Sequence, residues 1–215
     1  MVRGAQSLIP QSVEYSVKIE MPDLVKMYSD YKSPFAYLAF EPGLRLAERY
    51  NIAVRWRPFQ LRIKGKGERS TYSEYKTRYS YLDARRWAKS RDLIIRSQPK
   101  VYDTRIALIG GLFAQKHDKL MSFNLKVYEL FWKRELQPDD PDQVAGVVAH
   151  VGLAADGFRT YLAGAGANDY ERAQEEAATD HIFGVPIFLF NDEPFWGYDR
   201  IPMLQQRLAE AGLER

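Results

Sequence analysis

Strand-like stretches occur near the two ends of this chain, and a long central block of helical periodicity separates them. Apolar stretches at 23–29 and 52–58 flank an amphipathic segment at 34–50, which the Pro42-Gly43 pair is expected to kink or divide. These segments predict a βαβ unit, which is right-handed and parallel in nearly all proteins. Helical periodicity then runs from about Ser70 to Ala163.

The C-terminal part returns to strand character. Residues 185–190 predict a buried strand, Asn191-Asp192-Glu193 a tight turn and residues 194–196 the returning strand of a β-hairpin. A last helix at 200–211 follows, with Asp199 at its N-cap. Between the two ends we expect breaks at Gln98-Pro99, Gly110-Gly111 and 138–141, and helices at 142–151, capped by Gly152, and 168–179.

The order of these elements predicts the fold class. A βαβ unit, a helical block and a final α-β-β-α run predict an α/β protein with a thioredoxin-like fold and an all-helical insertion domain. We expect an N-terminal extension at 1–22, a thioredoxin-like domain at 23–66 and 168–215, and the helical insertion at 67–167. Residues 14–19 alternate weakly, so the extension could instead add an edge strand.

Composition limits the chemistry that the chain can supply. Its 215 residues include no cysteine, which excludes disulfides, thiolate metal sites and a dithiol redox cycle. Three widely separated histidines predict no metal site, and a net charge of +3 without a basic run disfavours nucleic acid. No stretch approaches the roughly 20 apolar residues that span a bilayer, and the N-terminal residues lack a signal peptide's apolar core. We expect a cytoplasmic protein without membrane contact.

A serine lies where the first predicted strand passes into a helix. Pro34 suits the first turn of a helix, so Ser33 is placed at the N-terminus, where unpaired N–H groups and the helix dipole favour an anion. Ser33 could simply cap the helix. Alternatively, its hydroxyl could donate to a bound thiolate and lower the pKa of that thiol. Thioredoxin-like proteins carry a redox cysteine at this point, so a chain without cysteine would bind a thiolate from another molecule.

The loop before the predicted hairpin contains Gly184-Val185-Pro186. In a thioredoxin-like fold this loop faces the N-terminus of the first helix. A cis Val185–Pro186 bond would leave the Val185 N–H and C=O groups exposed to pair with a peptide backbone. The alternative is an ordinary trans proline at the start of a strand.

Tyrosine and arginine alternate at the start of the central block, from Tyr72 to Trp87. Such a segment could bind single-stranded nucleic acid or line a pocket for an aromatic substrate. We favour an amphipathic helix with its Tyr and Trp side chains directed inward and its Arg side chains outward.

These motifs resemble the 2-hydroxychromene-2-carboxylate isomerase family, which is related to kappa-class glutathione transferases in the DsbA-like branch of the thioredoxin superfamily. The resemblance covers about residues 24–210. The matching segments are Asp30-Tyr31-Lys32-Ser33-Pro34-Phe35-Ala36-Tyr37-Leu38, Lys76-x-x-Tyr79-x-x-x-Asp83-x-x-Arg86-Trp87-Ala88, Phe183-Gly184-Val185-Pro186-Ile187-Phe188 and Phe195-Trp196-Gly197-Tyr198-Asp199-Arg200.

The resemblance implies glutathione as the cofactor. Ser33 would be the catalytic residue that hydrogen-bonds the sulfur, and Val185 beside Pro186 would hold the cysteinyl part. Asp199, with Tyr198 adjacent, would hold the γ-glutamyl end. In this family the thiolate is thought to add to an aromatic conjugated-carbonyl substrate, and bond rotation and elimination then release the product.

Two other functions are compatible with the same motifs. One is a kappa-like glutathione transferase that releases the conjugated product, and the other is a non-catalytic thioredoxin-like binding module. Members of this family tend to carry an asparagine, followed by prolines, after the second strand. Residues 61–69 occupy this place here and contain neither. The resemblance also implies a small aromatic electrophile as substrate and a homodimer.

Overall fold

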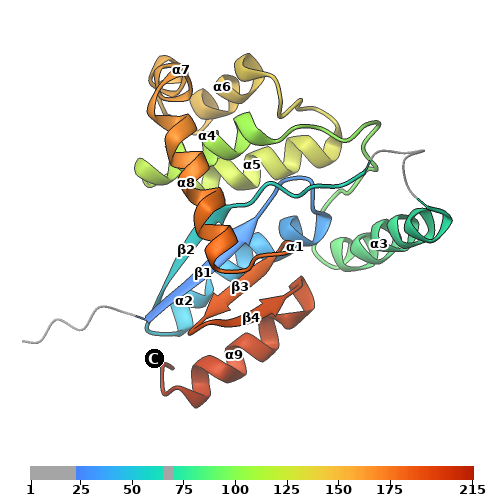
Figure 1. Cartoon of the computed structure of the whole chain (residues 1–215), viewed down its shortest axis with the longest axis vertical. Helices are drawn as coiled ribbons and strands as arrows, with labels where there is room; N and C mark the ends of the chain where they lie inside the picture. The colour runs from blue at the N-terminus through green and yellow to red at the C-terminus, as the bar shows by residue number, and fades with distance from the viewer. Residues whose placement is uncertain (1–22, 65–69) are drawn as a thin grey trace, which may run out of the picture.

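A computed structural model describes residues 23–64 and 70–215. The expected extension at 1–22 lies outside these residues. The centre is a four-stranded sheet in the order β2-β1-β3-β4 (Figure 1). Strands β1 and β2 are parallel, and the pairs β1–β3 and β3–β4 are antiparallel. Their bounds are Asp23–Ser29 (β1), Ile52–Pro58 (β2), Ile187–Phe190 (β3) and Glu193–Trp196 (β4).

The helices fall into the predicted order. The thioredoxin-like fold with a helical insertion is confirmed, while the exact domain boundaries stay a prediction. None of the described helices is both long and apolar enough to cross a membrane. The helices are α1 (Pro34–Leu44), α2 (Leu46–Arg49), α3 (Thr71–Lys89), α4 (Arg105–Lys116), α5 (Leu120–Lys133), α6 (Pro141–His150), α7 (Ala155–Ala163), α8 (Ala165–Thr179), a 3-10 turn η1 (Tyr198–Arg200) and α9 (Ile201–Glu210).

Helices α1 and α8 cover opposite faces of the sheet. Alternate residues of a strand point to opposite faces, and Met27 and Tyr28 of β1 belong to two different apolar clusters. Met27 lies under Gly43 of α1, and Tyr28 packs with Ala177 of α8. In Figure 1, α8 passes in front of the strands and α1 behind them, and α4–α7 gather beyond one end of the sheet. The N-terminus of α1 follows the end of β1 after a short loop, 30–33.

The predicted division of the first helix is confirmed. Helix α1 ends at Leu44 and α2 begins at Leu46, directly after the Pro42-Gly43 pair. The hairpin turn is also confirmed, because Asn191 and Asp192 both have positive φ angles (48° and 63°), as a type I′ turn requires.

The predicted break at Gly110-Gly111 is wrong, because both glycines lie inside α4. A Cβ atom at Gly110 would lie 2.6 Å from Phe123, and one at Gly111 would lie 2.6 Å from Trp56. The pair allows α4 to approach α5 and β2 closely, and this packing outweighs the low helix propensity of glycine.

The expected orientation of α3 is wrong. Tyr72, Tyr75 and Tyr79 are 85%, 61% and 59% exposed, and the buried residues of α3 are Ala84 and Ala88. Helix α3 lies to one side of the molecule in Figure 1 and packs on α1 through these small residues. Earlier turns of the same side, which carry Ser73, Thr77 and Ser80, contribute to the cleft described next.

Candidate active site at the N-terminus of α1

Ser33 is both a helix cap and a hydrogen-bond donor to the loop opposite. Its Oγ accepts from the N–H of Ala36 at 3.2 Å and donates to the carbonyl oxygen of Val185 at 3.1 Å. The side chain is nearly buried. The capping interpretation is therefore confirmed, and the single hydroxyl proton is directed at Val185.

The Val185–Pro186 peptide bond is cis, as predicted. The Pro186 carbonyl accepts from Gly197 at 3.0 Å, which ties the loop to the end of β4. Within the described residues, nothing accepts a hydrogen bond from the Val185 N–H. The expectation that both backbone groups of Val185 are unpaired is wrong for the carbonyl, because Ser33 donates to it.

A cleft of about 420 Å³ opens beside Ser33 and Val185. Helix α1 and the 183–185 loop form its base, and α3 forms one wall. Phe183 and Trp196 lie at its edge with their rings 5.0 Å apart in an edge-to-face arrangement. The full lining is Lys32, Ser33, Pro34, Phe35, Leu61, Ile63, Lys64, Ser73, Lys76, Thr77, Ser80, Tyr81, Phe183, Gly184, Val185 and Trp196.

A buried carboxylate lies behind the cleft. Asp30 is fully buried and accepts hydrogen bonds from Thr104 Oγ1 and the Leu61 N–H, both at 2.7 Å, and from the Lys32 N–H at 3.0 Å. The Lys32 ammonium lies 3.4 Å from Asp30 Oδ2. Burial raises the pKa of the Asp30 carboxyl, and the Lys32 charge acts in the opposite direction. Asp30 thereby joins the end of β1 to the segments after β2 and before α4.

Helix α5 supports the loop that carries Ser33. The hydroxyl oxygens of Ser29 and Tyr128 lie 2.5 Å apart, and Tyr31 donates to Asn124 Oδ1 at 2.7 Å. Burial raises the pKa of both tyrosines, so their hydroxyls remain neutral. A rigid support of this kind holds Ser33 in one position.

Tyr198 and Asp199 do not line the cleft. Tyr198 contacts Trp87 of α3 edge to face, with ring centroids 5.3 Å apart. The prediction that Asp199 caps the last helix is wrong: α9 begins at Ile201, Arg200 is its N-cap residue, and Asp199 lies in the preceding 3-10 turn. The exposed Asp199 carboxylate contacts the Arg200 guanidinium at 2.6 Å. The structure thus brings Ser33 and Val185 together and leaves Asp199 outside the cleft lining.

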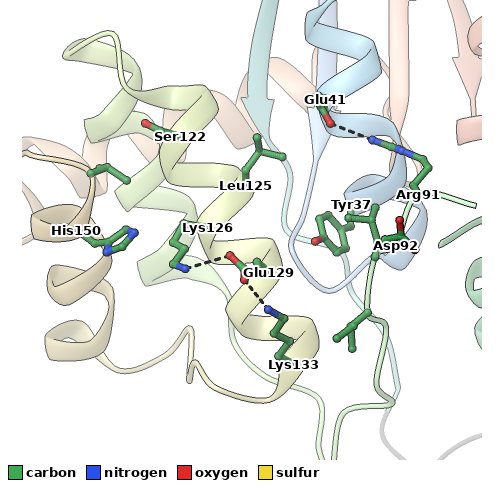
Figure 2. A pocket seen from close by; sticks show the side chains of 13 residues that line it. Tyr37, Glu41, Arg91, Asp92, Ser122, Leu125, Lys126, Glu129, Lys133 and His150 are labelled. Carbon is green, nitrogen blue, oxygen red and sulfur yellow. Dashed lines mark hydrogen bonds and ion pairs between the residues drawn. The ribbon is translucent and has the colours of Figure 1, made fainter. Parts of the chain in front are cut away.

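A larger groove of about 690 Å³ lies further along α1 (Figure 2). Most of its charges pair with one another: Arg91 with Glu41 at 3.1 Å, and both Lys126 and Lys133 with Glu129, at 3.1 and 2.5 Å. Asp92, which also lines the groove, forms no ion pair within the described residues. Figure 2 shows Glu129 between the two lysines. The groove contains neither Ser33 nor Val185.

The chain belongs to the DSBA-like thioredoxin domain family, whose model matches residues 24–209. It is 26% identical to 2-hydroxychromene-2-carboxylate isomerase of Sphingobium xenophagum over 88% of this chain and 100% of that protein. It is 28% identical to the enzyme of the same name from Pseudomonas putida, over 86% and 94%. A solved 2-hydroxychromene-2-carboxylate isomerase has a TM-score of 0.74 at 25% identity, covering 88% of this chain and 96% of that one. A probable DsbA oxidoreductase from Streptomyces coelicolor, at 17% identity and a TM-score of 0.73, shares the fold.

Sequence reasoning found Ser33 and Val185 and missed the walls of the cleft. Lys76, Phe183 and Trp196 belong to the motifs that resemble the isomerase family, but the sequence predicts no role for them. Lys32 could have been singled out, because a lysine directly before Ser33 places a second polar group at the same helix N-terminus. Part of the segment with the missing asparagine, residues 65–69, lies outside the described residues.

Proposed function

We propose that the chain is a glutathione-dependent isomerase that acts on an aromatic conjugated-carbonyl substrate. The contact of Ser33 with Val185 at the base of a largely apolar cleft, in a chain without cysteine, carries this proposal. The reacting thiol must come from another molecule. The relatives named 2-hydroxychromene-2-carboxylate isomerase support isomerisation as the reaction.

The base of the cleft fits a cysteinyl peptide. The Val185 N–H is without an acceptor among the described residues, and a buried backbone donor normally has one. An extended peptide can satisfy it and donate to the Val185 carbonyl, as in the addition of a strand to a sheet edge. Glutathione, a short peptide with a thiol, matches these groups.

The hydrogen bonds of Ser33 suggest how the thiol is activated. In the structure its one proton is directed at the Val185 carbonyl. If a peptide N–H of the ligand replaced Ser33 as the donor to this carbonyl, the Ser33 hydroxyl could donate its hydrogen bond to the sulfur instead. A hydrogen bond to the charged form lowers a thiol's pKa from its usual value of about 8.5. The N-terminus of α1 acts in the same direction.

Bound glutathione would supply a thiolate that adds reversibly to the conjugated double bond, which permits rotation about that bond before the thiolate leaves. Phe183 and Trp196 are exposed at the cleft and would hold the aromatic ring of the substrate.

Asp199 would bind the γ-glutamyl ammonium, because a carboxylate has about four acceptor sites and Asp199 is exposed. Pro186, beside Val185, and Tyr198, beside Asp199, would complete the glutathione-binding residues. The homodimer and the cytoplasmic location stay predictions.

A non-catalytic binding module is the second candidate. The observation in its favour is that the Ser33 hydroxyl is already satisfied by Ala36 and Val185. In such a module Ser33 would keep both bonds when a peptide binds, and the thiol of the ligand would retain its ordinary pKa.

Calorimetric titration with glutathione, combined with ultraviolet difference spectra of the thiolate, separates the two candidates. The isomerase should bind glutathione and show thiolate absorbance at neutral pH, and S-methylglutathione should bind without that absorbance. Binding without thiolate absorbance would favour the module. No binding at millimolar glutathione would refute the proposed cofactor.

A further inference from the structure

A cluster of charged side chains joins the last turn of α8 to the strands that it covers in Figure 1. The Tyr28 hydroxyl of β1 donates to Asp180 Oδ2 at 2.5 Å, and Lys26 Nζ lies 2.6 Å from the same oxygen. Glu176 pairs with Lys26 at 3.0 Å and with Arg57 of β2. None of these side chains is among the described residues that line the cleft.

Asp180 stands directly before the loop that carries Val185. It is the C-cap residue of α8, and the N–H of Ile182 donates back to the carbonyl of Ala177 at 2.9 Å, which closes the end of the helix. Residues 181–184 then separate Asp180 from Val185. Because this connection is short, the position of Asp180 constrains that of Val185.

Tyr28 is linked to both ends of this connection. Its side chain is fully buried and belongs to an apolar cluster with Ala177, Val185 and Ile187. Tyr28 and Ile187 are direct partners in the register of β1 and β3. Its hydroxyl bond to Asp180, at 2.5 Å, has the length of a hydrogen bond to a charged oxygen.

The protonation states of this pair suit such a bond. Burial raises the pKa of Tyr28, so its phenol stays neutral. Burial acts to raise the pKa of Asp180 too, but the hydrogen bonds from Lys26 and Tyr28 outweigh it and lower that pKa. A neutral donor therefore meets an ionised acceptor.

The site at the N-terminus of α1 depends on where Val185 lies. Its carbonyl accepts from Ser33 at 3.1 Å, and a displacement of about 0.5 Å would remove that hydrogen bond. We propose that Tyr28 is a positioning residue of the site: through Asp180 it holds the 181–185 segment so that the backbone of Val185 faces Ser33. The inference deepens the proposed function and rests on it for its ligand.

A second group of the same composition provides a matched control. Tyr161 donates to Asp169 Oδ2 at 2.6 Å, and Lys116 Nζ lies 2.8 Å from the same oxygen. The side chains of Asp169 and Asp180 are similarly buried, at 11% and 14% exposed. Asp169 lies near the start of α8, whereas Asp180 follows its last residue. Tyr161→Phe therefore removes an equivalent bond at the other end of the helix.

Amide hydrogen exchange by NMR on the glutathione-free protein and calorimetry with glutathione test the inference. Tyr28→Phe should speed the exchange of the amides of residues 182–185 about tenfold, because the lost bond was made to a charged group. It should also weaken glutathione binding about fivefold, a typical effect for a contact remote from the ligand. Tyr161→Phe should shift the urea unfolding midpoint by a similar amount and change neither of the other two properties.

Equal exchange of the 182–185 amides in the two variants would overturn the proposal, and so would faster exchange in Tyr28→Phe with unchanged affinity for glutathione. If Tyr28→Phe does not fold, Asp180→Asn replaces it, with Asp169→Asn as its control. A wild-type protein that does not bind glutathione would refute the proposed function. The exchange rates of the two variants would then still decide whether Tyr28 holds the segment.

Discussion

Two cavities border helix α1, and they differ in how their polar groups are satisfied. The larger groove of Figure 2 contains Glu41, Arg91 and Glu129, whose charges are compensated within the chain. The smaller cleft at Ser33 has lysines without carboxylates among its described lining residues, and a backbone N–H without an acceptor. The Val185 N–H, which has no acceptor among the described residues, can bind a ligand at little cost, whereas the ion pairs of the larger groove must first be separated. The cleft is therefore the better candidate site although it is smaller.

The largest effect is expected from Ser33→Ala. Under the proposed function, loss of the hydroxyl should raise the pKa of bound glutathione's thiol and lower the isomerisation rate by about a hundredfold, as for the loss of one donor in an active site. Spectroscopic titration of the thiolate measures the first effect and steady-state kinetics the second. Unfolding in urea should show a loss of about 0.5–2 kcal/mol, because the cap of α1 is removed.

A second helix cap provides the control for this loss of stability. Asp140 caps α6 by accepting from the N–H groups of Asp142 and Gln143, far along the chain from the cleft. Asp140→Ala should cost about as much stability as Ser33→Ala and leave the thiol pKa unchanged. A thiol pKa that is the same in Ser33→Ala and the wild type would contradict the activation role.

A smaller effect is expected at the far end of the proposed glutathione site. Asp199→Asn should weaken glutathione binding by up to about fivefold, because an ion pair at an exposed site contributes roughly 0.2–1 kcal/mol. Calorimetry measures the affinity. Glu193→Gln is a matched control, since Glu193 forms a comparably exposed ion pair with Arg207. Unchanged affinity in Asp199→Asn would place the γ-glutamyl group elsewhere.

The fold could be predicted from the sequence largely because strands and helices lie in separate parts of the chain. An apolar run marked β1, alternation that ends at a proline marked β2, and a turn signal marked the hairpin. The βαβ rule correctly predicted that β1 and β2 are parallel. Gly110 and Gly111 misled the prediction because their role depends on Phe123 and Trp56, which approach only in the folded state. The orientation of helix α3 was predicted wrongly for a related reason. Its buried residues are Ala84 and Ala88, and two alanines indicate a buried face less clearly than a row of tyrosines does.

The sequence predicted those parts of the candidate site that the backbone of the fold positions. It did not predict the parts that form where side chains from distant segments meet. Ser33 and Val185 could be paired because the fold places the first helix opposite the proline loop. The ion pair of Lys32 with Asp30 depends on where the Leu61 and Thr104 segments close over β1, and no local pattern encodes that. Asp199 was misplaced because a 3-10 turn precedes α9 and shifts the cap.

Removing charges from the larger groove should affect the chemistry least. Lys126→Met and Lys133→Met each leave Glu129 with one lysine partner. We expect glutathione affinity and isomerisation rate to stay within about twofold of the wild type, because neither lysine lies in the cleft and exposed pairs contribute little. A tenfold loss of either property would show that the groove participates, and the contrast between the two cavities would fail.

The smallest effect is expected from Glu129→Gln, and it concerns the free energy of unfolding rather than the reaction. Its pKa is lowered by Lys133 and Lys126, so folding favours the ionised carboxylate. This contribution is complete above the pKa of a glutamate in the unfolded chain, about 4.3, and is lost as the pH falls through the lower pKa of the folded state. Glu129→Gln should therefore cost about 0.2–1 kcal/mol at neutral pH, in the range of exposed ion pairs, and nothing in acid. Urea unfolding of both proteins across this pH range measures the difference, and a constant difference would mean that packing, rather than charge, holds Glu129 in the groove.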